Sequence, residues 1–196
     1  MGNKELQIVL WESNNNEYTL KEYIYEKMPS FDEIDKIVKG RKIVILIGEN
    51  PSKAEGIVCD ETNMYLRNKI YTLNKYNGYI LLNIFSEMAT KFQIKKEKID
   101  LEYIKVQCLL LNNYDFDIIL FYGKNVVTKI NKWKIDVELK KAFQDYMNEI
   151  KEHQLYITMY NSKFIHPALP GKKNKYNISN PKNHLYATFT SISFMV

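Results

Sequence analysis

Residues 41–56 read Arg41-Lys-Ile-Val-Ile-Leu-Ile-Gly-Glu-Asn-Pro-Ser-Lys-Ala-Glu-Gly56. The run from Ile43 to Ile47 is apolar and rich in β-branched residues, which predicts a parallel strand with helices on both faces of its sheet. The polar segment Gly48-Glu-Asn-Pro-Ser52 follows at once. Because open α/β sheets bind their ligands at the carboxyl ends of strands, this segment is either an ordinary turn or part of a binding site.

The length and the cysteine content of the chain narrow its class. A chain of 196 residues can form a core of its own, so we expect a single domain over residues 1–196. The two cysteines, Cys59 and Cys108, lie far apart in the sequence, which argues against an iron–sulfur cluster or a zinc site, and we expect no metal and no cofactor. The sequence has no membrane-length apolar run and no signal-peptide pattern, so we expect a cytoplasmic protein without a membrane partner.

The positive charge of the chain is concentrated at its carboxyl end. The formal net charge is +5, and Glu152 is the last acidic residue. Residues 153–196, which include a basic carboxyl-terminal segment over 171–196, contain Lys163, Lys172, Lys173, Lys175 and Lys182. Such a segment is either a solvated surface or a face that binds the phosphates of DNA or of a nucleotide.

Apolar strands alternate with helices along the chain. Residues 1–40 predict strands near 7–11 and 18–27, a polar turn over 12–17, and a helix over 31–38 that starts with a Ser30–Glu33 capping box. Further strands are predicted at 79–85, 117–122 and 155–159, and helices at 60–76, 101–112 and 137–153. We expect Leu66, Ile70 and Leu73 on the inner face of helix 60–76, which Asn77-Gly78 would close. This alternation predicts an α/β fold, a three-layer α/β/α sandwich with a central four-stranded parallel sheet.

Polar side chains follow several of these strands. The strand at 43–47 leads to Glu49, Asn50 and Ser52, the next apolar strand contains Asn83, and His166 comes after the last strand. Each could be an ordinary turn residue or, for His166, a structural histidine. Because the carboxyl ends of parallel strands lie along one edge, we expect these residues to share a site. Amide and imidazole groups match the donors and acceptors on the edge of a nucleobase.

Three of these segments resemble the signature motifs of a known family. Gly48-Glu-Asn-Pro51, Leu81-Leu-Asn83 and His166-Pro-Ala-Leu169 resemble those of the uracil-DNA glycosylase superfamily. The chain is still more similar to an uncharacterised bacterial and phage family within or near it, over about residues 41–170. The motifs of that family correspond here to Gly48 to Ser52, Asp60 with Thr62 and Arg67, Asn83 with Phe85, Ala89-Thr90, and His166-Pro167.

The resemblance implies a role for each matching residue. Asn50 stands where the uracil enzymes have a water-activating aspartate and where mismatch-specific glycosylases have asparagine. Asn83 would read the Watson–Crick edge of an extruded base, and His166 would contact the base carbonyl and stabilise charge as the glycosidic bond breaks. The other implied substrate-binding residues are Gly48, Glu49, Pro51, Ser52, Phe85, Thr62 and Arg67. Lys163, Lys172, Lys173 and Lys175 would contact DNA, and the basic segment after Pro170 stands where the superfamily has its DNA-inserting loop.

The chain also departs from the glycosylase pattern. An amide at position 50 can position a water molecule but cannot accept its proton, so Asp60, Glu49 or Glu55 would have to act as the base. Asp60, with Thr62 and Arg67, either caps its helix or faces the pocket. The candidate stacking surfaces are the aromatic residues near these motifs, which could equally belong to the core: Tyr65, Tyr76, Phe85 and Tyr122.

Three hypotheses about function follow. The leading one is a DNA glycosylase-like enzyme that hydrolyses the N-glycosidic bond of a flipped, modified or deaminated nucleotide. The second is a non-catalytic binder of nucleotides or nucleotide-derived signals that uses the same pocket. The third is a protein-interaction module on the same scaffold, because a fold alone does not fix a function.

Overall fold

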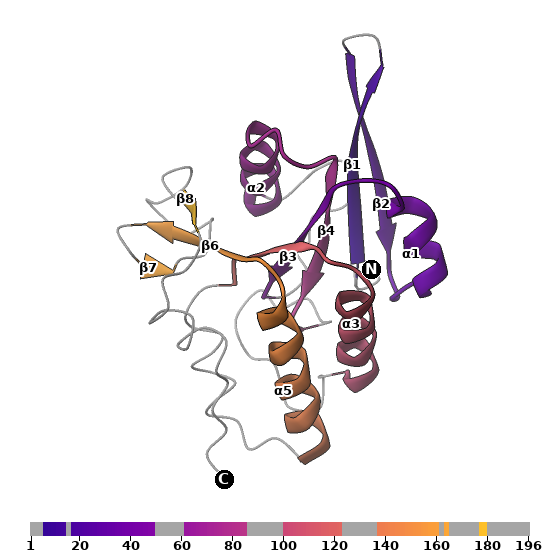
Figure 1. Ribbon diagram of the computed structural model, residues 1–196, viewed down its shortest axis with the longest axis vertical. Helices are drawn as coiled ribbons and strands as arrows, with labels where there is room; N and C mark the ends of the chain where they lie inside the picture. The colour runs from indigo at the N-terminus through magenta and orange to yellow at the C-terminus, as the bar shows by residue number, and fades with distance from the viewer. Residues whose placement is uncertain are drawn as a thin grey trace.

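The computed structural model describes residues 6–14, 17–49, 61–85, 100–122, 137–160, 163–164 and 177–179, and the structural findings concern these residues. The described strands form one sheet in the order β2-β1-β4-β3-β5-β6-β7, with β8 also paired to β6 (Figure 1). Their bounds are β1 Leu6–Asn14, β2 Glu17–Tyr25, β3 Ile43–Gly48, β4 Gly78–Asn83, β5 Asp117–Leu120, β6 Leu155–Tyr160, β7 Lys163–Phe164 and β8 Asn177–Ser179. The described helices are α1 Phe31–Val38, α2 Glu61–Thr72, α3 Leu101–Asn113 and α5 Val137–Glu152.

The sheet is mixed. Its neighbours β4, β3, β5 and β6 pair in parallel, and they correspond to the four apolar strands that the sequence predicts. The strands β1 and β2 form an antiparallel hairpin, and β1 also pairs antiparallel with β4. The prediction of an α/β fold is confirmed. The sheet is wider than the predicted four strands because the N-terminal hairpin and the short strands β7 and β8 join it.

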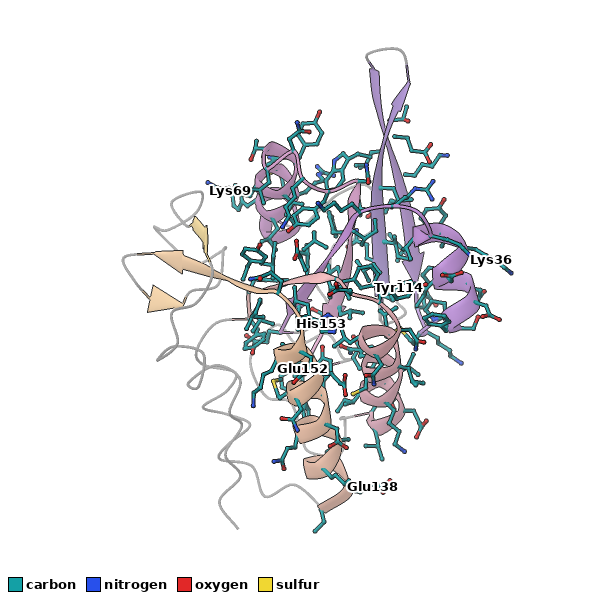
Figure 2. The ribbon with its side chains drawn as sticks, in the orientation of Figure 1. Lys36, Lys69, Tyr114, Glu138, Glu152 and His153 are labelled. Atoms are coloured by element: carbon teal, nitrogen blue, oxygen red, sulfur yellow. The ribbon has the colours of Figure 1, made fainter. Side chains whose placement is uncertain are left out.

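The N-terminal hairpin is longer than predicted. The predicted turn over 12–17 is too wide, because β1 continues to Asn14 and β2 begins at Glu17. Glu12 of β1 forms an ion pair with Lys21 of β2 at 2.6 Å and another with Arg41, which lies between α1 and β3, at 3.3 Å. Polar residues therefore continue the strand here, because neighbouring strands and loops supply charged partners. The ends of β1 and β2 near Asn14 and Glu17 extend beyond the rest of the sheet (Figure 1 and Figure 2).

Helices cover both faces of the sheet (Figure 1). Side chains of α1, α3 and α5 join the odd-numbered residues of β3, from Ile43 to Ile47, in one buried cluster. Side chains of α2 join the even-numbered Val44 and Leu46 in a second cluster. Successive strand residues point to opposite faces, so the continuous apolar run of β3 is explained by helices on both sides. None of the described helices combines the length and the apolar character needed to cross a membrane.

Helix α2 ends earlier than predicted. Its last residue is Thr72, and Asn74 adopts a positive φ of 47° two residues later. Leu73, expected on the inner face, is 49% exposed, because the helix has ended and the chain turns there. Asn77 belongs to the connection to β4, where its Oδ1 accepts a hydrogen bond of 2.9 Å from the backbone N–H of Lys42.

The strand order creates a switch point beside β3. The chain runs from β3 through α2 to its neighbour β4, and then through α3 to β5 on the other side of β3. These two connections pack on opposite faces of the sheet. The connections that leave β3 and β5 lead to helices on opposite faces of the sheet, and open α/β sheets bind ligands at the carboxyl ends of strands at such a switch point. The carboxyl ends of β3, β4 and β5 are therefore the candidate position of a ligand site.

Candidate functional site

Three residues meet at the carboxyl ends of β4, β3 and β5. Gly48 ends β3 and is in register with Asn83, which ends β4. A Cβ atom added to Gly48 would lie 2.7 Å from Asn83 Oδ1 and 2.5 Å from Phe121 Cζ. Both distances are shorter than real Cβ atoms tolerate. The absence of a side chain at position 48 therefore leaves the space in which the Asn83 carboxamide and the Phe121 ring lie side by side.

The Asn83 side chain lies on the α2 face of the sheet. Tyr79 and Leu81, which alternate with it along β4, belong to the buried cluster on that face. Phe121 belongs to the same cluster. Asn83 is 5% exposed, so its carboxamide lies at the edge of the core with little competition from water.

The backbone of Asn83 is held from the opposite side by two residues of α3. Its N–H donates to the hydroxyl oxygen of Tyr103 at 3.2 Å, and its carbonyl accepts from Gln107 Nε2 at 2.9 Å. Tyr146 of α5 in turn donates from its hydroxyl to Gln107 Oε1 at 2.6 Å. These bonds involve the backbone of Asn83, so they fix the end of the strand without using the carboxamide.

The network is buried, and burial raises the pKa of its phenol. Gln107 is fully buried, and Tyr146 is almost so. Desolvation raises the pKa of the Tyr146 phenol well above its ordinary value of 10.0, so the hydroxyl remains a donor in alkaline solution as well as at neutral pH.

The segments that leave β3 and β4 remain paired beyond the strands. The N–H of Ile84 donates to the Gly48 carbonyl at 3.0 Å, and the N–H of Phe85 donates to the Glu49 carbonyl at 3.1 Å. The predicted site residues Glu49 and Asn83 are therefore close in space. Phe85 is almost fully buried in the cluster packed by α1, α3 and α5, on the face opposite the Asn83 carboxamide.

Helix α2 carries two further predicted residues. Thr62 lies in its first turn and Arg67 lies one residue beyond the buried Leu66. Arg67 is half-buried. The helix packs on the face to which the Asn83 carboxamide points, so Arg67 is on the same side of the sheet as the candidate site.

Several predicted residues lie outside the described part of the chain. Lys163 is described only as a member of β7, paired with Tyr160 of β6. The site residues outside the described ranges are Asn50, Pro51, Ser52, Asp60, His166, Lys172, Lys173 and Lys175, together with Glu55 and Ala89-Thr90. Within the described residues, the structure thus brings together Gly48, Glu49 and Asn83.

The candidate stacking residues occupy different places. The Tyr76 hydroxyl donates to Asp117 Oδ2 at 2.6 Å, and Lys75 Nζ contacts the same oxygen at 2.5 Å. Asp117 begins β5, so Tyr76 lies at the amino edge of the sheet, away from Asn83. The pKa of Tyr76 is raised, mainly by burial and to a lesser extent by the hydrogen bond with Asp117. Tyr122 is a core residue, and Tyr65 packs against the core cluster on the α2 face.

Sequence reasoning missed the neighbours of Asn83. Phe121 was included in a strand predicted over 117–122, although it follows the last residue of β5 and bonds from its N–H to the Ile47 carbonyl at 3.0 Å. Tyr103 and Gln107 are four residues apart and so share one face of α3. A glutamine on the apolar face of that helix is the signal that could have identified the network.

The fold and these strand ends define an α/β protein with a candidate ligand site at the carboxyl edge of its sheet. No group of three or more potential metal-ligating side chains is found among the described residues. A family model covers residues 34–168, which include Gly48, Asn83 and His166. The chain belongs to this family, which is described as a protein of unknown function, DUF1643. No curated protein and no solved structure matches the chain.

Proposed function

We propose that the protein recognises a nucleobase at the carboxyl ends of β3, β4 and β5 and hydrolyses the N-glycosidic bond that joins it to DNA. The observation that carries the proposal is the Asn83 carboxamide, held at a strand end by backbone bonds and adjacent to Gly48. The resemblance of the three motifs to the uracil-DNA glycosylase superfamily supports it. The proposal includes the finer fold assignment, in which the parallel strands form the central sheet of a glycosylase-like three-layer sandwich.

Recognition would depend on the carboxamide of Asn83. This group offers one acceptor and two donors, which can pair with the Watson–Crick edge of a flipped base. Because Asn83 is 5% exposed, a base without matching groups would leave these atoms unpaired away from water. That mismatch is costly, so the arrangement supports discrimination between bases as well as affinity.

Hydrolysis would transfer the elements of water across the bond. The water oxygen bonds to the sugar carbon, and the electron pair of the broken bond goes to the nitrogen of the nucleobase. The proton of water passes to a carboxylate of the protein and finally to the nucleobase. In this scheme Asn50 positions the water, His166 stabilises the charge on the base, and Asp60, Glu49 or Glu55 accepts the proton. The lysines of the carboxyl-terminal part would hold the DNA phosphates.

The test is incubation of the full chain with duplex and single-stranded DNA that contains uracil, a mismatch or a modified base. We expect an abasic product with at least one substrate, detected as a strand break after alkali. Asn83→Asp keeps the shape of the side chain but removes its two donors, so it should reduce product formation. Asn68→Asp, on the exposed face of α2, adds the same charge and is the matched control. Absence of product with every substrate contradicts the proposal.

A second function is favoured by one feature of the sequence. Asn50 cannot accept a proton from water, so the same pocket would suit a protein that binds free nucleotides without cleaving them. In that case a mononucleotide raises the melting temperature by mass action, and duplex DNA does not. Salt dependence separates the two functions further, because binding through several DNA phosphates weakens steeply as salt increases.

A further inference from the structure

Side chains of α3 bind the peptide groups of Asn83 on the side of β4 that faces β1. From Asn77 to Ile84, which flank β4, the odd-numbered residues bond toward β1 and the even-numbered residues toward β3. The Asn77 carbonyl accepts from the N–H of Trp11, and the N–H of Ile84 donates to the Gly48 carbonyl. The described pairing of β1 with β4 ends at Gln7 and Leu81. At the next odd position, Tyr103 and Gln107 take the places that a strand would occupy.

The orientation of the Gln107 amide is fixed by its two neighbours. The Asn83 carbonyl can only accept a hydrogen bond, so Gln107 must present its NH₂ group there, at 2.9 Å. The Gln107 oxygen then faces the Tyr146 hydroxyl, which donates to it at 2.6 Å. A reversed amide would bring two carbonyl oxygens together in a buried site. The network therefore has one arrangement, and it ends on the backbone of Asn83.

The network and the candidate site lie on opposite faces of the sheet. Gln107 and Tyr146 come from α3 and α5, which pack on one face, whereas the Asn83 carboxamide shares the α2 face with Phe121. The peptide of Asn83 connects the two, because its orientation sets the direction of the Cα–Cβ bond. A small rotation of this peptide would move the carboxamide relative to Gly48, beside which it lies.

We propose that Gln107 is a positioning residue for Asn83: it fixes the last peptide of β4 from the α3 face and so sets the direction in which the carboxamide is presented on the α2 face. Tyr146 supports this role by holding the Gln107 amide. The proposal rests on the proposed function only in taking the carboxamide as the group that binds the base. The positioning itself is measurable without any ligand.

The first arm of the test observes the Asn83 side chain directly. In the full chain labelled with ¹⁵N, the side-chain NH₂ signals of Asn83 are assigned by their disappearance in Asn83→Asp. Gln107→Met keeps an unbranched side chain of similar length and removes both hydrogen bonds of the Gln107 amide. We expect it to shift the Asn83 NH₂ signals. Gln144→Met, at an exposed position of α5, is the matched control and should leave them unchanged.

Two further variants separate positioning from general destabilisation. Tyr146→Phe removes only the outer hydrogen bond, so we expect a smaller shift of the Asn83 signals in the same direction, and this variant carries the test if Gln107→Met does not fold. Ile34→Val, in the core beneath α1, loosens the fold at a residue that takes no part in the hydrogen-bond network and should not move these signals. Unchanged Asn83 signals in both Gln107→Met and Tyr146→Phe overturn the proposal.

The second arm measures binding of uracil and of a short single strand containing one deoxyuridine. If wild-type protein binds either probe, Gln107→Met should weaken binding about tenfold. This is the factor expected when one buried hydrogen bond between the Asn83 carboxamide and the probe is lost. Equal affinity of wild type and Gln107→Met overturns the proposal. If wild type binds neither probe while the Asn83 signals still shift, the positioning by Gln107 is supported and the proposed function is the part that fails for uracil.

Discussion

The carboxamide oxygen of Asn83 lies against Gly48, only 2.7 Å from the point that a Cβ atom at position 48 would occupy. The two residues are in register at the ends of neighbouring parallel strands, and the Phe121 ring fills the other side of the same space. Glycine is required here by crowding rather than by an unusual φ. Gly48 thus makes room for the carboxamide of Asn83, which ends the neighbouring strand β4.

Gly48→Ala should damage both stability and ligand binding. The added methyl group would be 2.5 Å from Phe121 Cζ and 2.7 Å from Asn83 Oδ1, so the ring or the carboxamide must move. Overpacking of this kind costs about 1–3 kcal/mol of unfolding free energy. We expect a loss in that range by urea denaturation and a loss of base or nucleotide binding by calorimetry.

Gly40→Ala is the matched control for that substitution. Gly40 has a φ of +71°, and no heavy atom lies within 4 Å of a Cβ placed on it. Its replacement costs backbone strain, on the order of 1 kcal/mol, without crowding any residue. Gly40→Ala should therefore lower stability and leave binding unchanged. Equal loss of binding in both variants would mean that destabilisation, and not the position of Asn83, explains the result at Gly48.

Asn50→Asp should raise the rate of base release if the protein is a glycosylase. A carboxylate can accept a proton from the attacking water, and a positioned general base contributes roughly 10²- to 10⁴-fold. We expect faster formation of abasic product on the best substrate, measured in single-turnover reactions. Asn68→Asp controls for the added charge. A rate that does not increase would favour a proton acceptor elsewhere, and Asp60→Asn and Glu49→Gln would then identify it.

Local sequence patterns were sufficient to predict the parallel strands and the first helix. The run from Ile43 to Ile47 is apolar on both faces, which is the requirement of a strand between two layers of helices. The Ser30–Glu33 capping box is confirmed in both directions, with bonds of 2.9 and 3.4 Å. These features depend on residues within a few positions of one another, so the sequence contains the full information.

Features that depend on distant pairing were not predictable in this way. The antiparallel pairing of β1 with β4 joins residues some seventy positions apart, such as Ile8 and Ile80. The network around Asn83 requires α3 to pack against α5 so that Gln107 meets Tyr146. The position of Asn83 at the end of a strand could be predicted, because the apolar run that precedes it is a local pattern. Its supporting residues could not, because their contacts arise only after the helices pack.

Cys108 should react slowly with thiol reagents. The pKa of its thiol is raised to about 12, mainly by burial and to a lesser extent by the negative charges of Glu149 and Asp145. At pH 8 only about one molecule in ten thousand would carry the reactive thiolate. In a Cys59→Ser background, we expect alkylation by iodoacetamide to be far slower in the folded chain than in urea. Fast alkylation of the folded chain would contradict this, whereas Glu149→Gln should increase the rate modestly.

Stability should fall steeply above pH 10. Burial raises the pKa of Tyr122 and Tyr146 above the ordinary 10.0, and the Asp117 hydrogen bond raises the pKa of Lys75 above 10.5. A group whose pKa is higher in the folded than in the unfolded state adds to the free energy of unfolding. This contribution is fully present below the pKa of the unfolded state and is lost as the pH rises through the pKa of the folded state. Each buried phenol adds a slope of up to about 1.4 kcal/mol per pH unit in that window.

Urea denaturation between pH 8 and 11.5 should show a flat region and then a decline. In Tyr122→Phe the decline should be shallower, because one titrating phenol is removed, and an unchanged slope would show that Tyr122 does not contribute to it.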